Sequence, residues 1–159
     1  MKKNKKDKVG FFIGIIIAGV FILAAVLFTL IQYEFKALGV SAAKYNGFVT
    51  AFGKDNYEGY AVFCLPFFLS ALAAAGIILT ALGLLKFNGR ALFAACTAFA
   101  LISVIIYITA YFHILGKYGR GGLIALSKNV KWTFAFWCGF ALQCMACFGS
   151  GYAAVSGGK

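Results

Sequence analysis

Four long runs of apolar residues, separated by short polar segments, dominate the pattern of the chain. They cover residues 9–31, 60–85, 91–115 and 132–155, and none of them contains Asp, Glu, Lys or Arg. A helix needs about 20 apolar residues to cross the hydrocarbon layer of a membrane, and each run is longer than that. Transmembrane strands would be shorter and would alternate apolar with polar residues, which these runs do not do. The pattern therefore predicts four membrane-spanning helices.

The amino-acid composition agrees with this pattern. Hydrophobic residues make up 63% of the 159 positions and charged residues only 12%, whereas about a quarter of a soluble domain is charged. These proportions exclude a soluble enzyme, a disordered chain, a coiled coil and a disulfide-stapled secreted domain. We predict an all-α integral membrane protein, in which residues 1–159 form a single membrane domain built as a left-handed four-helix bundle.

The orientation of the bundle follows from its N-terminal segment. Five of the first eight residues are lysine, and the apolar run that follows is too long for the core of a signal peptide. We interpret it as a retained signal anchor. Because basic flanks stay on the cytoplasmic side, residues 1–8 are predicted to form a cytoplasmic tail, with both termini inside. The expected location is the plasma (inner) membrane, as a multi-pass protein.

The first outer loop, residues 34–59, is longer than a plain connector. Its apolar residues recur at spacings of three and four, which predicts an amphipathic helix lying over the bundle or in the membrane interface. Gly39, Gly47 and Gly53 oppose that prediction, because glycine lowers helix propensity. We expect the loop to be a folded cap; the alternative is a surface for a partner or ligand. The candidate cap residues are Phe35, Leu38, Tyr45, Val49 and Phe52.

The second outer loop, residues 116–131, carries four basic residues and no acidic one. Basic segments beside a membrane attract anionic lipid head groups. We therefore predict that this loop contacts lipid, with an ordinary solvated loop as the alternative. The candidate contact residues are Lys117, Arg120, Lys128 and Lys131.

Packing between the spans is expected to use small residues and one buried amide. Gln143 lies in the middle of the fourth span, where its two polar ends need a partner on another helix or another protomer. A pore-lining role for this residue is the alternative. Glycines let helix backbones approach closely. The candidate close-approach residues are Gly10, Gly14, Gly76 and Gly83.

The chain offers little for chemistry. All five cysteines and the single histidine, His113, fall inside predicted spans, and no acidic residue does. Buried cysteine usually packs as a small hydrophobic residue, and catalytic or proton-relay sites in membranes need several ionisable groups together. We therefore expect no enzyme activity, no metal, no cofactor and no nucleic-acid partner.

Two functions remain in view at this point. The first is a non-catalytic scaffold or accessory subunit of a membrane complex, and the second is a small homo-oligomeric channel or facilitator. The expected partners are the lipid bilayer, anionic head groups, and a membrane protein or further copies of the chain. The layout is similar to that of claudin-like tetraspans, but the first outer loop lacks the tryptophan and paired cysteines of that family, so no family is assigned.

Overall fold

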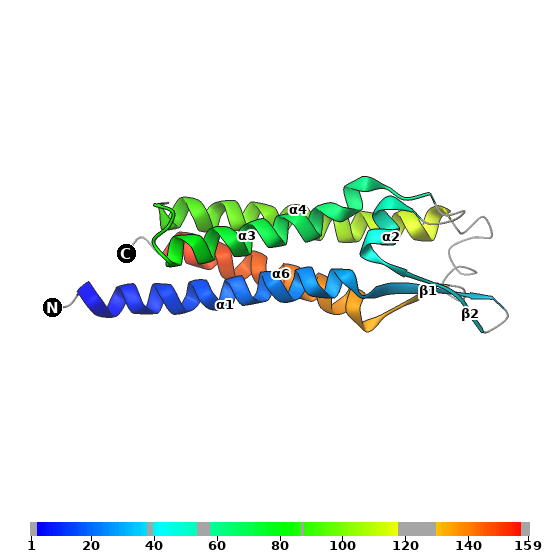
Figure 1. Ribbon diagram of the computed structural model, residues 1–159, viewed down its shortest axis with the longest axis horizontal. Coiled ribbons are helices and arrows are strands. Elements are labelled where there is room, and N and C mark those ends of the chain that lie inside the picture. Colours follow the sequence, from blue (N-terminus) through cyan, green and yellow to red (C-terminus); the bar gives the residue numbers. More distant parts are fainter. Residues whose placement is uncertain (1–2, 38–39, 54–57, 87, 118–129, 157–159) are drawn as a thin grey trace.

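Four long helices form the body of the protein in the computed structural model, which describes residues 3–37, 40–53, 58–86, 88–117 and 130–156. They are α1 (Lys3–Thr29), α3 (Leu65–Ala81), α4 (Gly89–Lys117) and α6 (Phe134–Ser156) (Figure 1). A short 3-10 turn, η1 (Ala61–Cys64), leads into α3. All four helices are long and apolar enough to cross a membrane. The chain is thus a mostly helical, multi-pass membrane protein.

The helices form a closed ring of neighbours. Helix α1 packs against α3 and α6, and α4 packs against the same two helices. Successive helices run in opposite directions, so both ends of the chain lie at one end of the bundle and the strands lie at the other (Figure 1). We call these the terminal end and the sheet end.

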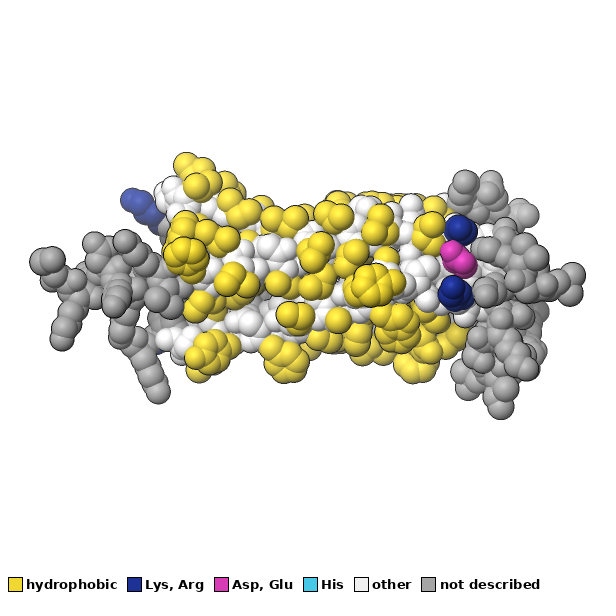
Figure 2. Space-filling model, turned by 90° about the horizontal axis from the view of Figure 1, so that it is seen from below, with side chains coloured by type: hydrophobic (Ala, Val, Ile, Leu, Met, Phe, Trp, Pro, Cys, Tyr) yellow, Lys and Arg dark blue, Asp and Glu magenta, His cyan; other side chains and the backbone are white. Residues whose placement is uncertain are grey.

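The outside of the bundle suits hydrocarbon. Large apolar side chains such as Phe12, Leu72, Ile105 and Phe148 are exposed on all four helices. On the face shown in Figure 2, hydrophobic side chains cover the length of the bundle, and the described charged side chains lie only near its two ends. An apolar surface of this extent is unfavourable in water and favourable in lipid.

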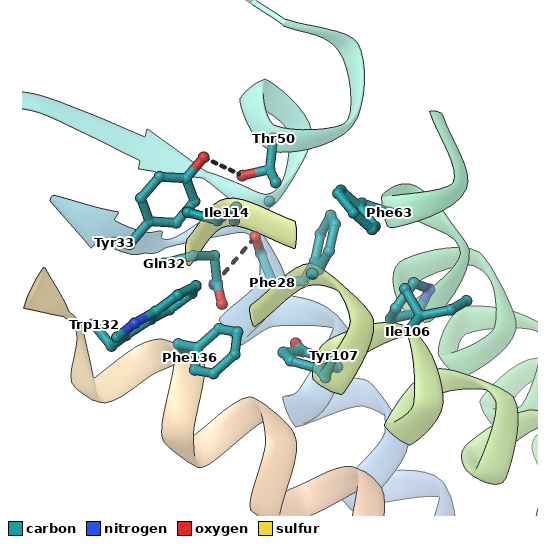
Figure 3. A pocket seen from close by; sticks show the side chains of 13 residues that line it. Phe28, Gln32, Tyr33, Thr50, Phe63, Ile106, Tyr107, Ile114, Trp132 and Phe136 are labelled. Atoms are coloured by element: carbon teal, nitrogen blue, oxygen red, sulfur yellow. Dashed lines mark hydrogen bonds between the residues drawn. The ribbon is translucent and has the colours of Figure 1, made fainter. Parts of the chain in front are cut away.

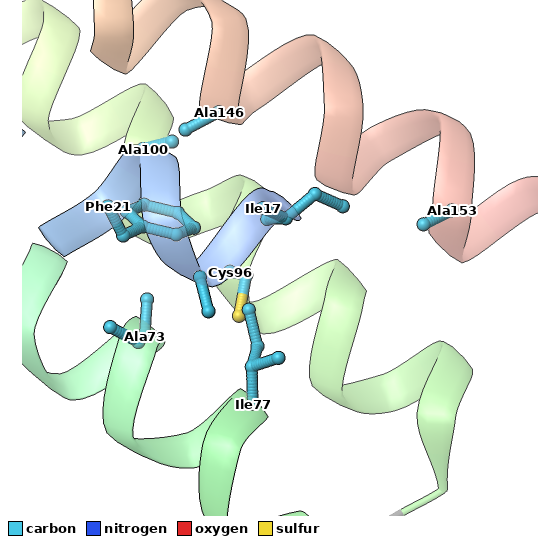
Figure 4. Close-up of a cluster of buried hydrophobic side chains, with 10 residues drawn as sticks. Ile17, Phe21, Ala73, Ile77, Cys96, Ala100, Ala146 and Ala153 are labelled. Atoms are coloured by element: carbon cyan, nitrogen blue, oxygen red, sulfur yellow. The ribbon is translucent and has the colours of Figure 1, made fainter. Parts of the chain in front are cut away.

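The interior is built mainly from small residues around one large ring (Figure 4). Phe21 of α1 and Ala100 of α4 are both 0% exposed. Small side chains let the helix backbones approach, and close contact drives helix association in membranes. The buried cluster consists of Ile17, Ala18, Phe21, Ala73, Ala74, Ile77, Cys96, Ala100, Ala146 and Ala153. The centre of the bundle is therefore filled by side chains.

The sequence suggested that Gly83 packs between helices. In the structure, Gly83 instead follows the end of α3. Its φ of 73° is left-handed, and a side chain placed there would meet nothing within 4 Å. The amide of Gly83 donates to the carbonyl of Thr80, and that of Leu84 donates to the carbonyl of Leu79, both at 3.0 Å. This pair of bonds is the Schellman motif, which glycine favours because it adopts positive φ without strain.

Two other helices begin at residues suited to a helix start. The side-chain oxygen of Asn88 accepts from the amide of Arg90 at 3.1 Å and so caps the start of α4. Pro66 lies in the first turn of α3, where its missing N–H leaves no helical hydrogen bond unmade.

The predicted amphipathic helix over the first outer loop is wrong. That segment contains two strands, β1 (Ile31–Ala37) and β2 (Val40–Asn46), followed by the short helix α2 (Gly47–Phe52). A third strand, β3 (Val130–Trp132), comes from the second outer loop, and the antiparallel sheet has the order β2-β1-β3. Trp132 is therefore in a strand, although the sequence placed it in the fourth span.

The physical reason for the hairpin is a period of two within β1. Ile31, Tyr33 and Phe35 are apolar, and the residues between them are polar, which is the pattern of a half-buried strand. The glycines separate the elements: Gly47 begins α2, and Gly53, with φ 80°, ends it. The apolar residues that recur at spacings of three and four are therefore distributed over two strands and a helix.

The predicted cap residues accordingly do not share one helix face. Phe35 and Tyr45 lie on adjacent strands, with ring centroids 5.5 Å apart. Val49 and Phe52 lie on α2, where Phe52 is exposed and its ring stacks on that of Phe48. Leu38 lies outside the described residues.

Candidate functional site

The junction between the sheet and the bundle begins at a β-bulge. Ile31 pairs with Asn46 and Tyr33 with Tyr45, so Gln32 is an extra residue in β1. Its side chain turns back onto the end of α1, where Nε2 donates to the carbonyls of Leu27 at 2.6 Å and Leu30 at 3.1 Å. The bulge residue thus donates to carbonyls at the end of α1, where the last carbonyls of a helix lack some of their helical partners.

An aromatic group, which we call the junction cluster, holds the sheet against the bundle. The stacked rings of Tyr33 and Tyr45 lie 5.3 Å apart, and the Trp132 ring packs on Tyr33 at 5.4 Å. Trp132 in turn contacts Tyr111 of α4 at 4.9 Å and Phe136 of α6 at 4.3 Å. Tyr33 is only 1% exposed. All three strands are therefore joined to two helices through large rings that are buried or partly buried, and whose contacts stabilise beyond burial alone.

Backbone hydrogen bonds add to this junction where α6 begins. The amide of Thr133 donates to the carbonyl of Gln32 at 2.9 Å. Its hydroxyl donates to the same carbonyl at 3.0 Å and also to the carbonyl of Ile31. The residue that precedes α6 is thereby tied to the first residues of β1, about one hundred positions earlier in the chain.

A cavity of about 30 Å³ lies beneath the sheet, lined by residues of five helices, the turn η1 and two strands (Figure 3). Two of its lining residues carry a buried polar atom, Gln32 Oε1 and Tyr107 Oη, that has no hydrogen-bond partner in the described part of the chain. The other labelled lining residues are Phe28, Tyr33, Thr50, Phe63, Ile106, Ile114, Trp132 and Phe136. The site combines a mostly aromatic wall with two polar groups.

Charge at the sheet end centres on Glu34. This residue lies opposite Lys44 on one side and Lys131 on the other, and the Lys44 ammonium is 3.6 Å from the Glu34 carboxylate. The side chains of Lys44 and Lys131 are exposed. Of the other residues predicted to contact lipid, Lys117 is the last residue of α4, and Arg120 and Lys128 lie outside the described residues.

Gln143 lies in the middle of the bundle, at the depth the sequence indicated. Its Nε2 donates to the Ser70 hydroxyl on α3 at 2.6 Å, while its Oε1 has no partner among the described residues. Both side chains are buried, at 1% and 0% exposure. The structure thus joins Gln143 to another helix of the same chain.

The glycines predicted to pack between helices fall into different environments. A side chain at Gly14 would touch Ile77 at 3.5 Å, and one at Gly76 would touch Leu92 at 3.4 Å. Both therefore lie where a neighbouring helix is close. Gly10 also lies on α1.

Two glycines that the sequence had not assigned to helix packing lie in tighter places. At Gly47 a Cβ atom would come within 2.5 Å of the Phe28 ring, and at Gly139 it would come within 2.7 Å of the Tyr107 hydroxyl. Phe28 and Tyr107 both line the cavity. A side chain at either glycine would therefore displace a residue of the cavity wall.

The cysteines do not gather into a site. All five are free thiols on the helices or η1, and the described residues contain no cluster of three or more His, Cys, Asp or Glu side chains. His113 packs against the ring of Tyr60, with centroids 4.3 Å apart.

Comparison with known proteins adds no relative. No protein-family model matches the chain, and neither a curated protein nor a solved structure matches it.

Gln32, Tyr107 and Trp132, which line the cavity at the junction, were not predicted from the sequence as site residues. The alternation in residues 31–37 was a usable signal for β1, and therefore for the inward position of Tyr33. Nothing in the local sequence marks Gln32 as a bulge residue, because the bulge is defined by its pairing with β2.

Proposed function

We propose that the protein is a non-catalytic scaffold or accessory subunit of a membrane complex, which presents its sheet on the outer side of the membrane. The observation that carries the proposal is the attachment of the sheet to α4 and α6 through the junction cluster. Loops that only connect helices do not need buried aromatic anchors. A surface held by a rigid scaffold is suited to recognition. The five lysines among the first eight residues support the orientation, because basic flanks stay in the cytoplasm.

The edges of the sheet are the surface we propose for the partner. Among the described strands, β2 and β3 each have one neighbour, whereas β1 has two. An edge strand displays backbone donors and acceptors that can pair with a strand from another protein. Lys44 on β2 and Lys131 on β3 are exposed beside these edges. They favour a membrane protein partner with an acidic outer surface and, next to the bilayer, anionic head groups.

A channel is the less favoured function for a physical reason. Phe21 and Ala100 are completely buried and fill the interior, so a solute has no water-filled route along the axis of one bundle at that level. Conduction would require a path between protomers. The proposed scaffold needs no such path.

Site-directed photo-cross-linking in the native membrane tests the scaffold. A photoreactive amino acid replaces Lys44 in one variant and Val155 in a matched control, where the side chain is exposed at the other end of the bundle. We expect an adduct of one defined mass from the Lys44 site and none from the Val155 site. An absence of adducts at Lys44, or the same adducts from both sites, would contradict the proposed partner surface.

Reconstitution into lipid vesicles tests the alternative function, a channel. Purified protein in vesicles is compared with empty vesicles for the flux of small ions and neutral solutes. The scaffold predicts equal flux in both samples. A saturable flux that depends on the protein would favour the channel.

A further inference from the structure

The cavity beneath the sheet contains two polar atoms that the protein itself leaves without partners. Gln32 and Tyr107 are each 4% exposed, and both residues line the same space (Figure 3). Neither oxygen has a hydrogen-bond partner in the described part of the chain. Buried polar atoms in folded proteins are nearly always hydrogen-bonded, to the protein or to an ordered small molecule.

The chemistry of both atoms is set by their surroundings. The Nε2 atom of Gln32 is bound to the carbonyls of Leu27 and Leu30. Carbonyls only accept, so the amide oxygen is the end left for the cavity. The hydroxyl of Tyr107 lies against Gly139, where a side chain would come within 2.7 Å of it. The cavity therefore offers one fixed acceptor and one hydroxyl that both donates and accepts.

The volume and the walls limit what fits. About 30 Å³ is sufficient for a water-sized molecule, since a single water needs roughly 10–15 Å³ measured in this way. It is far below the roughly 150 Å³ of a cavity that accepts benzene. Phe28, Phe63 and Phe136 form an uncharged wall, which disfavours an ion.

We propose that this cavity is a binding site for one hydroxyl-bearing molecule of about the size of water. The hydroxyl of this bound molecule donates a hydrogen bond to Gln32 Oε1. It forms a second hydrogen bond with Tyr107 Oη. It thereby links β1 to α4, alongside the junction cluster. The shared chemistry is an O–H group, and its two sources are water and a small alcohol such as methanol.

Nuclear magnetic resonance of the full chain in detergent micelles tests occupancy directly. Dipolar cross peaks between water and the side-chain amide protons of Gln32 are recorded for the wild type, Tyr107→Phe and Tyr111→Phe. Tyr111 is the matched control, because it lies one turn further along α4 and does not line this cavity. We expect the cross peaks in the wild type and in Tyr111→Phe, and their loss in Tyr107→Phe. Their absence from the wild type would overturn the proposal, unless the methanol titration below shows an alcohol bound there.

Titration with methanol distinguishes the two sources. Saturable displacement of the water cross peaks, with shifts confined to Gln32 and Tyr107, identifies an alcohol as a second source of the hydroxyl. Cross peaks that persist identify water as the sole source. If the wild type shows no water cross peaks and methanol produces no saturable shift, neither source binds and the proposal fails.

Thermal unfolding of Tyr107→Phe gives a second measurement. The change in Tm has one sign if the cavity is empty and the opposite sign if it holds a guest. If the Tyr107 hydroxyl has no partner, Tyr107→Phe removes a buried unpaired group and the Tm rises. If the hydroxyl holds a guest, the same change leaves Gln32 Oε1 without its bridge and the Tm falls. We expect a fall that exceeds the change in Tyr111→Phe. A Tm above that of the wild type would contradict the site.

Discussion

Gln143 of α6 and Ser70 of α3 are joined by a 2.6 Å hydrogen bond between helices at opposite corners of the bundle. Each of these helices packs along its length against α4, and they meet through this buried pair. The bond lies within one chain. It accordingly acts in the folding of the single bundle and does not depend on contact with another protomer.

This placement predicts that Gln143→Leu leaves the oligomeric state unchanged. The substitution removes the donor to Ser70 and also the buried Oε1 that lacks a partner among the described residues. Hydrogen bonds in membranes average about 0.6 kcal/mol, so the free energy of unfolding should change by about 1 kcal/mol or less. Size-exclusion chromatography with light scattering in detergent measures the assembly, and Ser70→Ala serves as the partner control. Dissociation of a native oligomer in the Leu variant alone would show that Gln143 also contacts a protomer.

Gly47→Ala should destabilise the sheet end. The added methyl would lie 2.5 Å from the Phe28 ring, which is itself packed against Phe48 and Phe67. Overpacking of this kind costs about 1–3 kcal/mol. Denaturant titration in mixed micelles measures the loss. Gly19→Ala is the matched control, because that position is open, and it should be neutral or stabilising. Equal stability of the two variants would show that Phe28 moves aside without cost.

Gly83→Ala should weaken the end of α3. Its φ of 73° forces an L-residue into the left-handed region, at a cost of about 1–2 kcal/mol. Gly89→Ala, which is equally free of neighbours and lies at the start of α4, should show no comparable loss. The same unfolding measurement compares the two. A Gly83→Ala protein as stable as the wild type would mean that the turn adopts another geometry.

Replacement of all five cysteines by Ala should leave a folded, membrane-inserted protein. Each thiol is free, and the buried Cys96 packs in the Ala-rich core, so its loss creates only a small cavity. Circular dichroism and metal analysis of the purified variant check this expectation. Loss of a bound metal or of a redox partner would contradict a packing role for the thiols.

The sequence was sufficient to predict the membrane-spanning helices. It was not sufficient to predict the sheet formed by the segments that connect them. Runs without charge identify spans reliably because lipid excludes charged residues over the whole length of a helix. A period of 3.6 did not reveal the sheet, because it joins Phe35 to Phe52 across Gly47, where β2 has ended and α2 begins. The alternation from Ile31 to Ala37 was present in the same stretch.

The candidate site could not be read from local sequence for a different reason. The cavity brings Gln32 on β1 together with Tyr107 on α4 and Trp132 on β3. Their proximity depends on the order of helices around the bundle and on the register of a bulged strand. Neither property is encoded in a short stretch of residues.

Two loops far apart in the sequence form one sheet. Glu34 of β1 lies directly opposite Lys131 of β3, and Cα atoms of such antiparallel pairs are about 4.5–5.5 Å apart, within the range that a disulfide spans. Lys44 and Lys131 lie on opposite sides of β1, roughly 9–10 Å apart at the usual strand spacing. That pair is therefore the control.

Oxidative cross-linking in the cysteine-free protein tests this claim most directly. The variants are Glu34→Cys with Lys131→Cys, and Lys44→Cys with Lys131→Cys, each oxidised in membranes and analysed by mass spectrometry of unreduced peptides. A disulfide that forms in the first pair and not in the second is the predicted result. Absence of the disulfide in the first pair, or equal formation in both, would contradict the sheet.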